Sequence, residues 1–387
     1  MAIATGAWAL FLSPGPGKRV APPPTPGEPL NWASGAAIGE GSLWVLTCSA
    51  RCTGEAKGAE AHLLRFDLGT GRELAKIPVS NPQAIAVGEG AVWVIDFWDD
   101  EVLRVDPGSN RVEATIKLVL NFAFAPGDHA FLPFAITAGE GAVWVDTERG
   151  AVARIDPTTN RVTAVIRVKS KAASGLAAGE GAVWVTGDLA GVARIDPRTN
   201  KASATIPGGT CRHGLSLEQI VAGAGAVWAL GAKSTGETGG GTLPPCISTI
   251  ASGLALVRID PATNRVVATI SLLQGAVILG MGIVGPERGV VWVSDGTDVW
   301  SVDPATNRIS RPTPCPARSV LAVGPNGTLW VLDSGGRLSQ FQTLRPSEGR
   351  LRAVSGRGRN SIDGGGSLPL DGGRRSAHPP TEESTST

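Results

Sequence analysis

The sequence predicts an all-β fold, a seven-bladed β-propeller of four-stranded antiparallel blades, and three observations lead to this prediction. The first is that short apolar or alternating segments, each the length of a strand, follow one another along the chain. The second is that two turn sequences, Gly-Glu-Gly and Asp-Pro-x-x-Asn, recur between these segments. The third is a tryptophan that recurs at seven places, 38 to 64 residues apart: Trp44, Trp93, Trp144, Trp184, Trp228, Trp292 and Trp330. Repeats of this size are typical of solenoids and propellers.

The repeat is clearest at residues 177–206, which read AAGEGAVWVTGDLAGVARIDPRTNKASATI. It predicts four strands: an apolar run ending before Gly179, then AVWV, then GVARID, then KASATI. Gly-Glu-Gly joins the first two strands, because glycine supplies the positive φ that a tight hairpin needs. Asp-Pro-x-x-Asn joins the last two. There Pro presets φ, Asp accepts backbone N–H groups and Asn tolerates the left-handed conformation.

The second strand of each repeat carries the tryptophan between other apolar residues, as in Val143-Trp144-Val145. Such a strand is apolar on both faces, so it belongs inside a stack of sheets, and radially stacked four-stranded sheets form a propeller. We therefore expect the tryptophans to pack between blades rather than to form an aromatic cage for a ligand.

In chain order, blade one has Asp67-Leu68-Gly69-Thr70-Gly71 in place of the usual turn between its third and fourth strands. We expect the seven blades at residues 33–79, 82–118, 133–168, 173–207, 217–272, 277–311 and from 318.

The last blade is expected to be closed by strands from both chain ends. Gly17-Lys18-Arg19-Val20 is similar to the start of a fourth strand, Asn160-Arg161-Val162, so residues 1–30 are read as the closing strand segment. The propeller then spans 1–343. Residues 344–387 are rich in Gly, Arg, Ser and Pro, and we expect them to be a disordered tail.

The motif GxGAVWV followed by V-x-R-I-D-P-x-T-N-R-V-x-A-T-I resembles the bacterial YVTN and YncE-like β-propeller repeats, which are similar to repeats of the virginiamycin B lyase (streptogramin lyase) superfamily. The resemblance covers roughly residues 30–341. It implies the propeller fold. It does not fix a function, because these families include proteins with binding roles beside a few lyases.

Insertions interrupt the repeat at residues 47–61, 119–132, 207–216 and 231–253. All fall at the two kinds of connection that emerge on one face of a propeller, and insertions gathered on one face usually mark the binding face.

The five cysteines fall on the same face. We expect a Cys211–Cys246 disulfide and a small loop closed by Cys48 and Cys52, with Cys315 left over. Disulfides place the protein outside the cell or in the cell envelope. A metal site is the weaker alternative, because no second Cys or His pair has ligand spacing.

Acidic residues follow the second strands and are densest in Asp96-Phe97-Trp98-Asp99-Asp100-Glu101. Around the channel mouth they could bind a cation, a basic ligand or a sugar. His129 and His213 both fall in loops that enter a first strand, near the channel mouth. The candidate ligand-binding residues are Asp96, Trp98, Asp99, His129, Asp146, Asp188, His213, Glu218, Asp295, Arg318 and Asp333.

The composition excludes some partners. With 35 basic and 34 acidic residues the net charge is +1, which favours neither nucleic acid nor an anionic membrane. The apolar run near residue 10 is too short to span a bilayer.

We therefore predict a monomeric, non-enzymatic binding or interaction module without a cofactor, whose partner is a small molecule or a protein at the loop-rich face. The resemblance implies an alternative, a streptogramin-lyase-like carbon–oxygen lyase with a magnesium-assisted site at the channel mouth. No catalytic residue is assigned, because no histidine here stands in a local His-x-x-Glu or Glu-x-x-His motif.

Overall fold

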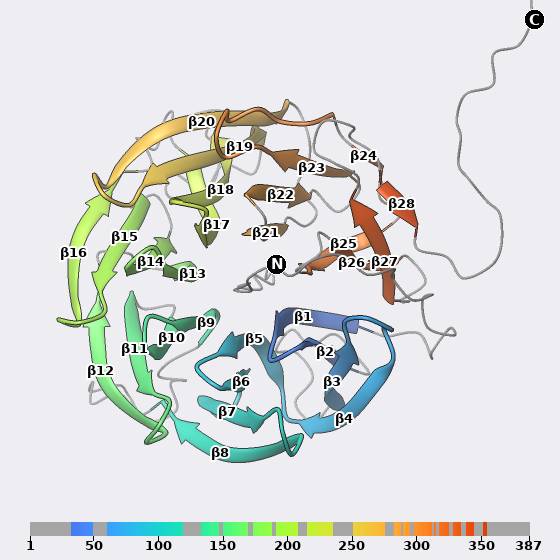
Figure 1. The fold of residues 1–387 in the computed structure, drawn as a ribbon. Coiled ribbons are helices and arrows are strands. Elements are labelled where there is room, and N and C mark those ends of the chain that lie inside the picture. Colours follow the sequence, from blue (N-terminus) through green and yellow to red (C-terminus); the bar gives the residue numbers. More distant parts are fainter. Residues whose placement is uncertain are drawn as a thin grey trace, which may run out of the picture.

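A computed structural model of the chain describes residues 32–48, 60–118, 133–146, 150–168, 173–187, 191–207, 215–234, 251–274, 282–287, 289–294, 298–311, 313–314, 317–324, 328–333, 338–343 and 351–353. These residues form seven four-stranded antiparallel sheets arranged around a central axis (Figure 1). The architecture is that of an all-β propeller with four-stranded blades. The described residues contain no helix, and therefore none that could cross a membrane.

Each sheet is a meander in which consecutive strands are neighbours. Sheets 1 to 4 comprise β1 (Trp32–Gly39), β2 (Ser42–Cys48), β3 (Ala61–Asp67) and β4 (Glu73–Val79); β5 (Pro82–Gly88), β6 (Ala91–Asp96), β7 (Glu101–Asp106) and β8 (Arg111–Lys117); β9 (Ile136–Gly139), β10 (Ala142–Asp146), β11 (Ala151–Asp156) and β12 (Arg161–Arg167); and β13 (Ala173–Gly179), β14 (Ala182–Gly187), β15 (Gly191–Asp196) and β16 (Lys201–Ile206). Sheets 5 to 7 comprise β17 (Leu215–Gly223), β18 (Ala226–Ser234), β19 (Ala251–Asp260) and β20 (Arg265–Gln274); β21 (Gly282–Glu287), β22 (Val290–Ser294), β23 (Asp298–Val302) and β24 (Thr313–Pro314); and β25 (Ala317–Val323), β26 (Thr328–Asp333), β27 (Leu338–Thr343) and β28 (Leu351–Ala353).

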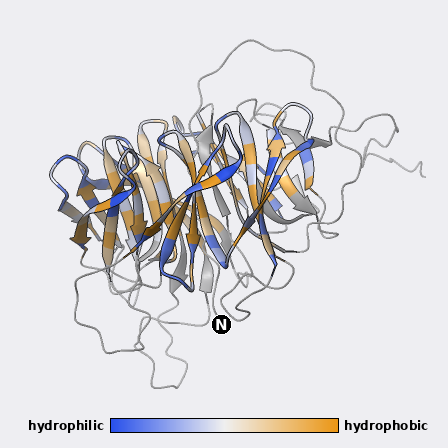
Figure 2. Ribbon diagram, turned by 90° about the horizontal axis from the view of Figure 1, so that it is seen from below, coloured by the Kyte–Doolittle hydropathy of each residue, from blue (hydrophilic) through white to orange (hydrophobic). Residues whose placement is uncertain are grey.

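The core lies between the sheets. Every residue of β6 is buried, whereas the outer strand β8 is mostly exposed. Seen from the side, the disc has hydrophobic positions along its strands and hydrophilic positions at the turns (Figure 2). The seven repeat tryptophans have exposed fractions between 0 and 9%. Trp93 of sheet 2, for example, belongs to one cluster with Ile136, Val143 and Ile155 of sheet 3. The tryptophans pack between blades, as the sequence predicts.

The two recurrent turns explain the sharp hairpins. In the first turn the glutamate itself takes a positive φ together with the glycine after it, as at Glu140 (φ 54°) and Gly141 (φ 74°). Two central residues with positive φ form the hairpin turn whose twist matches that of the strands. In the second turn the asparagine is left-handed, as at Asn160 (φ 56°), and Asp156 Oδ1 accepts the N–H groups of Thr158 and Thr159.

Closure of the ring differs from the prediction. Among the described residues the fourth strand of sheet 7 is β28, from the C-terminal side, and not a strand from residues 1–30, which lie outside the described part. The segment Leu351–Ala353 also lies within the tail for which no structure was expected. Sheet 7 meets sheet 1 through side chains: Trp330 and Ala322 cluster with Ile38 and Phe66. Closure therefore uses packing between two sheets, which local sequence similarity does not reveal.

Candidate functional site

The ends of the second strands lie opposite the Gly-Glu-Gly and Asp-Pro turns, because the strands of each sheet are antiparallel. This strand-end face is the one on which the sequence predicts binding. Polar side chains are buried here at the end of second strands, among them Asp96, Asp146 and Thr186. The candidate residues whose side chains are described gather where sheets 2 and 3 meet. We call the group Asn81, Asp96, Phe97, Trp98, Asp99, Phe134 and Asp146 the 2–3 site.

Asp96 ends β6 and is only 2% exposed. Asn81 Nδ2 donates a hydrogen bond of 3.4 Å to Asp96 Oδ1, and the N–H of Phe97 donates to the carbonyl oxygen of Asn81 at 3.1 Å. Burial raises the pKa of Asp96 to about 6, and the nearby charges of Asp99 and Glu101 add to the rise, although hydrogen bonds from Asn81 and the Asp99 backbone oppose it. Asp96 is thus a buried carboxyl group that titrates near neutral pH.

The turn from β6 to β7 carries three further carboxylates, Asp99, Asp100 and Glu101. Asp99 is exposed, whereas Glu101 pairs with Lys117 at 2.8 Å. The hydrogen bond to Glu101 and its charge raise the pKa of Lys117. Asp100 takes a positive φ of 50°, and its carbonyl oxygen accepts the N–H of Leu118 at 2.9 Å. The turn is therefore tied to the outer strand β8.

Three aromatic rings adjoin these carboxylates. Phe97 lies edge-on to Trp98, with ring centres 5.6 Å apart, and edge-on to Phe134, with ring centres 5.5 Å apart. All three side chains are half-buried. Phe134 precedes β9, so the aromatic group joins sheet 2 to sheet 3.

Asp146 has a structural part in this junction. It ends β10 and is fully buried. Its Oδ1 accepts the N–H of Phe134 at 3.2 Å and that of Ala135 at 2.6 Å. The carboxylate thereby fixes the chain that brings Phe134 to Phe97.

Other predicted residues are not brought into this site. His129, Asp188, His213 and Asp295 lie outside the described residues, as do Cys52, Cys211, Cys246, Cys315 and most of the four insertions. Glu218, Arg318 and Asp333 lie in β17, β25 and β26, but their side chains are not described. Cys48 is disulfide-bonded and its partner lies outside the described residues, so the pairing with Cys52 stays a prediction. Within the described part of the chain no three His, Cys, Asp or Glu side chains are placed to hold a metal ion.

Sequence reasoning missed Asn81, Phe97 and Phe134. Asn81 directly precedes β5, and Phe97 stands inside the acidic run, so both had a local signal. Phe134 had none, because its contact with Phe97 depends on how two neighbouring sheets pack.

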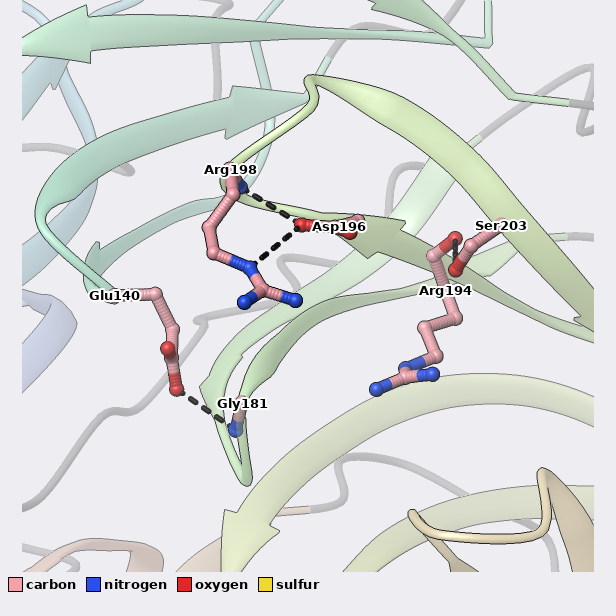
Figure 3. A network of polar contacts seen from close by, with 6 residues as sticks. All are labelled: Glu140, Gly181, Arg194, Asp196, Arg198 and Ser203. Carbon is pink, nitrogen blue, oxygen red and sulfur yellow. Dashed lines mark hydrogen bonds and ion pairs between the residues drawn. The ribbon is translucent and has the colours of Figure 1, made fainter.

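The repeated charged groups on the opposite face serve the scaffold. The Glu140 carboxylate accepts the N–H of Gly181 in the next sheet at 3.0 Å, and Asp196 accepts the N–H of Arg198 in its own turn at 2.8 Å (Figure 3). A guanidinium group of the third strand lies over the tryptophan of the same sheet in five sheets, 4.9 to 5.7 Å from the ring centre. These are cation–π contacts. Both groups make their contacts within the scaffold.

Comparison with known proteins supports the class of fold. No protein-family model matches the chain, and no curated protein matches it. Among solved structures the chain is similar to Kuenenia stuttgartiensis hydrazine synthase, with a TM-score of 0.61 and 14% identity over 82% of this chain and 97% of that one. It is also similar to a streptogramin B lyase, with a TM-score of 0.56 and 13% identity over 80% of this chain and 93% of that one. The third similar structure is the WD40 domain of Neurospora crassa Pan2, with a TM-score of 0.55 and 12% identity over 80% of this chain and 88% of that one. At such identities the likeness shows the fold alone, and the three names cover different functions.

Proposed function

We propose that the seven sheets form one closed seven-bladed ring that acts as a non-enzymatic binding module, and that the 2–3 site takes a ligand with a positively charged group on a small apolar body. The observation that carries the proposal is the buried carboxyl group of Asp96 beside half-buried aromatic rings and the exposed Asp99. Aromatic faces and carboxylates together attract organic cations.

Binding is favoured over catalysis because the other carboxylates of the region already have structural partners. Asp146 holds two backbone N–H groups, and Glu101 is paired with Lys117. A lyase needs a base and an acid or metal converging on one point. The described contacts instead hold these groups in place.

Choline is a suitable probe, because 3,3-dimethylbutanol is its neutral isostere. We expect calorimetry or ligand-observed NMR to detect choline and not the isostere. Trp98→Ala and Asp99→Asn should each weaken choline binding about three- to tenfold, the range of a partly exposed cation–π or ion-pair contact. Glu73→Gln, on the outer strand β4, is the control that should leave binding unchanged. Equal affinity for the two probes, or no effect of Trp98→Ala and Asp99→Asn, would rule out the 2–3 site as a cation site.

A second candidate function, a streptogramin-lyase-like activity with magnesium, is supported by the likeness to the streptogramin B lyase fold. Incubation of the protein with a streptogramin B compound and Mg²⁺, followed by mass spectrometry for the opened ring, tests it. No turnover would leave binding as the function.

We also propose export to the cell envelope or beyond, with a bridge between Cys211 and Cys246. The support is that the repeat pattern of the sequence assigns all five cysteines to connections predicted to lie on one face. Peptide mapping without reduction tests the bridge, and finding both thiols free would refute it.

A further inference from the structure

Two kinds of contact join consecutive sheets on the turn side of the ring, and each junction from sheet 1 to sheet 6 has one kind or the other. The first is the glutamate contact. Glu89, Glu140 and Glu180 each accept an N–H from the corresponding turn of the next sheet, at Gly141, Gly181 and Gly225, with 3.0 Å between the atoms in each case. These contacts join sheet 2 to 3, sheet 3 to 4 and sheet 4 to 5.

The second kind is the arginine contact, made from the third strand. Arg65 Nη1 of sheet 1 donates to Asn110 Oδ1 of sheet 2 at 2.9 Å, and Arg258 Nη1 of sheet 5 donates to Asn307 Oδ1 of sheet 6 at 3.1 Å. These are two junctions that lack the glutamate contact. Among the described residues Glu40 accepts no N–H from sheet 2, and Ala224 replaces the glutamate in sheet 5.

In sheets 2 and 3 the arginine side chain is engaged within its own sheet, and in sheet 4 Arg194 donates no side-chain hydrogen bond among the described residues. Arg104 pairs with Glu113 at 3.7 Å, and Arg154 Nη1 donates to Thr163 Oγ1 at 3.2 Å. In sheet 4, Ser203 Oγ donates to the carbonyl oxygen of Arg194 at 3.2 Å (Figure 3). The asparagines that follow in the next sheets keep a buried side-chain oxygen without a hydrogen-bond partner: Asn160, Asn200 and Asn264.

The two sheets whose arginine reaches the next sheet differ from the other three in one residue. It is the extra residue of a β-bulge between the third and fourth strands. In all five sheets the register shifts at this point, opposite the arginine. The bulge residue is polar in the three sheets whose arginine does not reach the next sheet: Glu113, Thr163 and Ser203. It is apolar and exposed in the other two, as Leu74 (40%) and Val267 (52%).

Another residue near the arginine does not explain the difference. Ser42 Oγ accepts from Arg65 Nε at 2.8 Å, which could hold Arg65 toward the next sheet. Arg258 reaches the next sheet too, although its Nε has no such partner. An apolar bulge residue is a feature that Arg65 and Arg258 share and that the other three arginines lack.

We infer that the bulge residue selects the partner of the arginine and thereby sets how each blade is joined to the next. In sheets 2 and 3 a polar bulge residue binds the arginine side chain and keeps it in its own blade, and a glutamate in the turn then makes the contact between blades. In sheet 4 the polar Ser203 binds the backbone of Arg194 instead, and the glutamate contact is again present. An apolar bulge residue releases the arginine to the asparagine of the next blade. The ring thus has two types of junction between blades, and one exposed side chain determines the type.

Double-mutant cycles test this inference. Arg65→Met combined with Asn110→Gly should show coupling of about fivefold in the unfolding equilibrium constant, the value of one hydrogen bond, while Arg104→Met combined with Asn160→Gly should show none. Glycine is chosen because both asparagines have positive φ. In a Glu113→Leu background the second pair should gain coupling, and in a Leu74→Glu background the first pair should lose it.

Leu74→Ala is the matched control, because it keeps the bulge apolar and should preserve the first coupling. Should the arginine variants fold poorly, hydrogen exchange in Glu113→Leu and Thr163→Val alone gives a second readout. The turns at residues 157–160 and 197–200 should then exchange more slowly, since each asparagine gains an arginine partner. Equal coupling at both junctions, or no response to the bulge substitutions, would overturn the inference.

Discussion

Asp96 is a carboxyl group that the fold keeps from water, and its pKa of about 6 makes stability depend on pH. In the unfolded chain an aspartate titrates near 4, so the folded state binds the proton more tightly. The stabilisation from the protonated form is complete below about pH 4 and is lost as the pH rises through about 6.

We therefore expect Asp96→Asn to stabilise the protein at pH 7.5 by about 1–3 kcal/mol and to change little at pH 4. The free energy of unfolding at the two pH values is the measurement. Glu40→Gln, an exposed carboxylate on the opposite face of the ring, is the control and should change the free energy of unfolding equally at both pH values. A destabilised Asp96→Asn at pH 7.5 would show that the ionised carboxylate is needed where it lies.

At the scale of elements, the hairpin between the first and second strands does two things at once. Gly139 has a φ of 153°, and a Cβ there would lie 3.1 Å from the Cβ of Ala178 in the next sheet. Its carbonyl oxygen accepts the indole N–H of Trp144 at 3.0 Å. The glutamate that follows then reaches the next turn. The hairpin therefore sets both the fold of its own sheet and the distance to its neighbour.

Glu140→Ala should lower stability by about 0.5–1.5 kcal/mol, because the N–H of Gly181 loses its acceptor. Glu140→Gln keeps an oxygen in place and should cost less. Glu40→Ala is a close control, since Glu40 has the same turn position and a φ of 49° but makes no such contact among the described residues. Chemical denaturation of the three variants measures the differences, and equal losses for Glu40→Ala and Glu140→Ala would contradict the assignment.

The local features of these elements could be predicted from the sequence, and the contacts between elements could not. Strands, turn types and tryptophan packing follow from residues that are neighbours in the chain, such as Asn160 in its turn. Glu89 and Gly141 lie 52 positions apart, and Glu40 stands in the same motif without the contact. Asp96 could be proposed as a site residue from the acidic run, but its burial and its neighbour Phe134 depend on the packing of two sheets.

For the whole molecule, the junction of sheets 1 and 7 decides whether the ring stays closed. Ile38 is 1% exposed and clusters with Ala322 and Trp330. Gln340 Nε2 also donates to the carbonyl oxygen of Leu68 at 3.4 Å. The sequence predicted a hydrogen-bonded closure because residues 17–20 resemble a fourth strand, and similarity of this kind says nothing about which sheet faces pack.

Ile38→Ala should destabilise the protein by about 2–5 kcal/mol, the usual result of a cavity in a core. Hydrogen exchange should rise in residues 328–331 of β26, far away in sequence, if the two sheets support each other. Ile136→Ala, in the core between sheets 2 and 3, is the control. It should not speed hydrogen exchange in β26 when the two variants are compared at the same free energy of unfolding. Faster exchange confined to sheet 1 after Ile38→Ala would mean that closure does not depend on this packing.

The glutamate contacts all run in one direction, from each sheet to the sheet that follows it in the chain. During synthesis the N-terminal part of a chain leaves the ribosome first. The new hairpins of sheets 3, 4 and 5 therefore each meet a carboxylate already in position on the blade made just before, so this arc can grow one blade at a time. Its two ends, in contrast, can meet only after Trp330 has been added, which makes joining the first blade to the last a late step of biosynthesis.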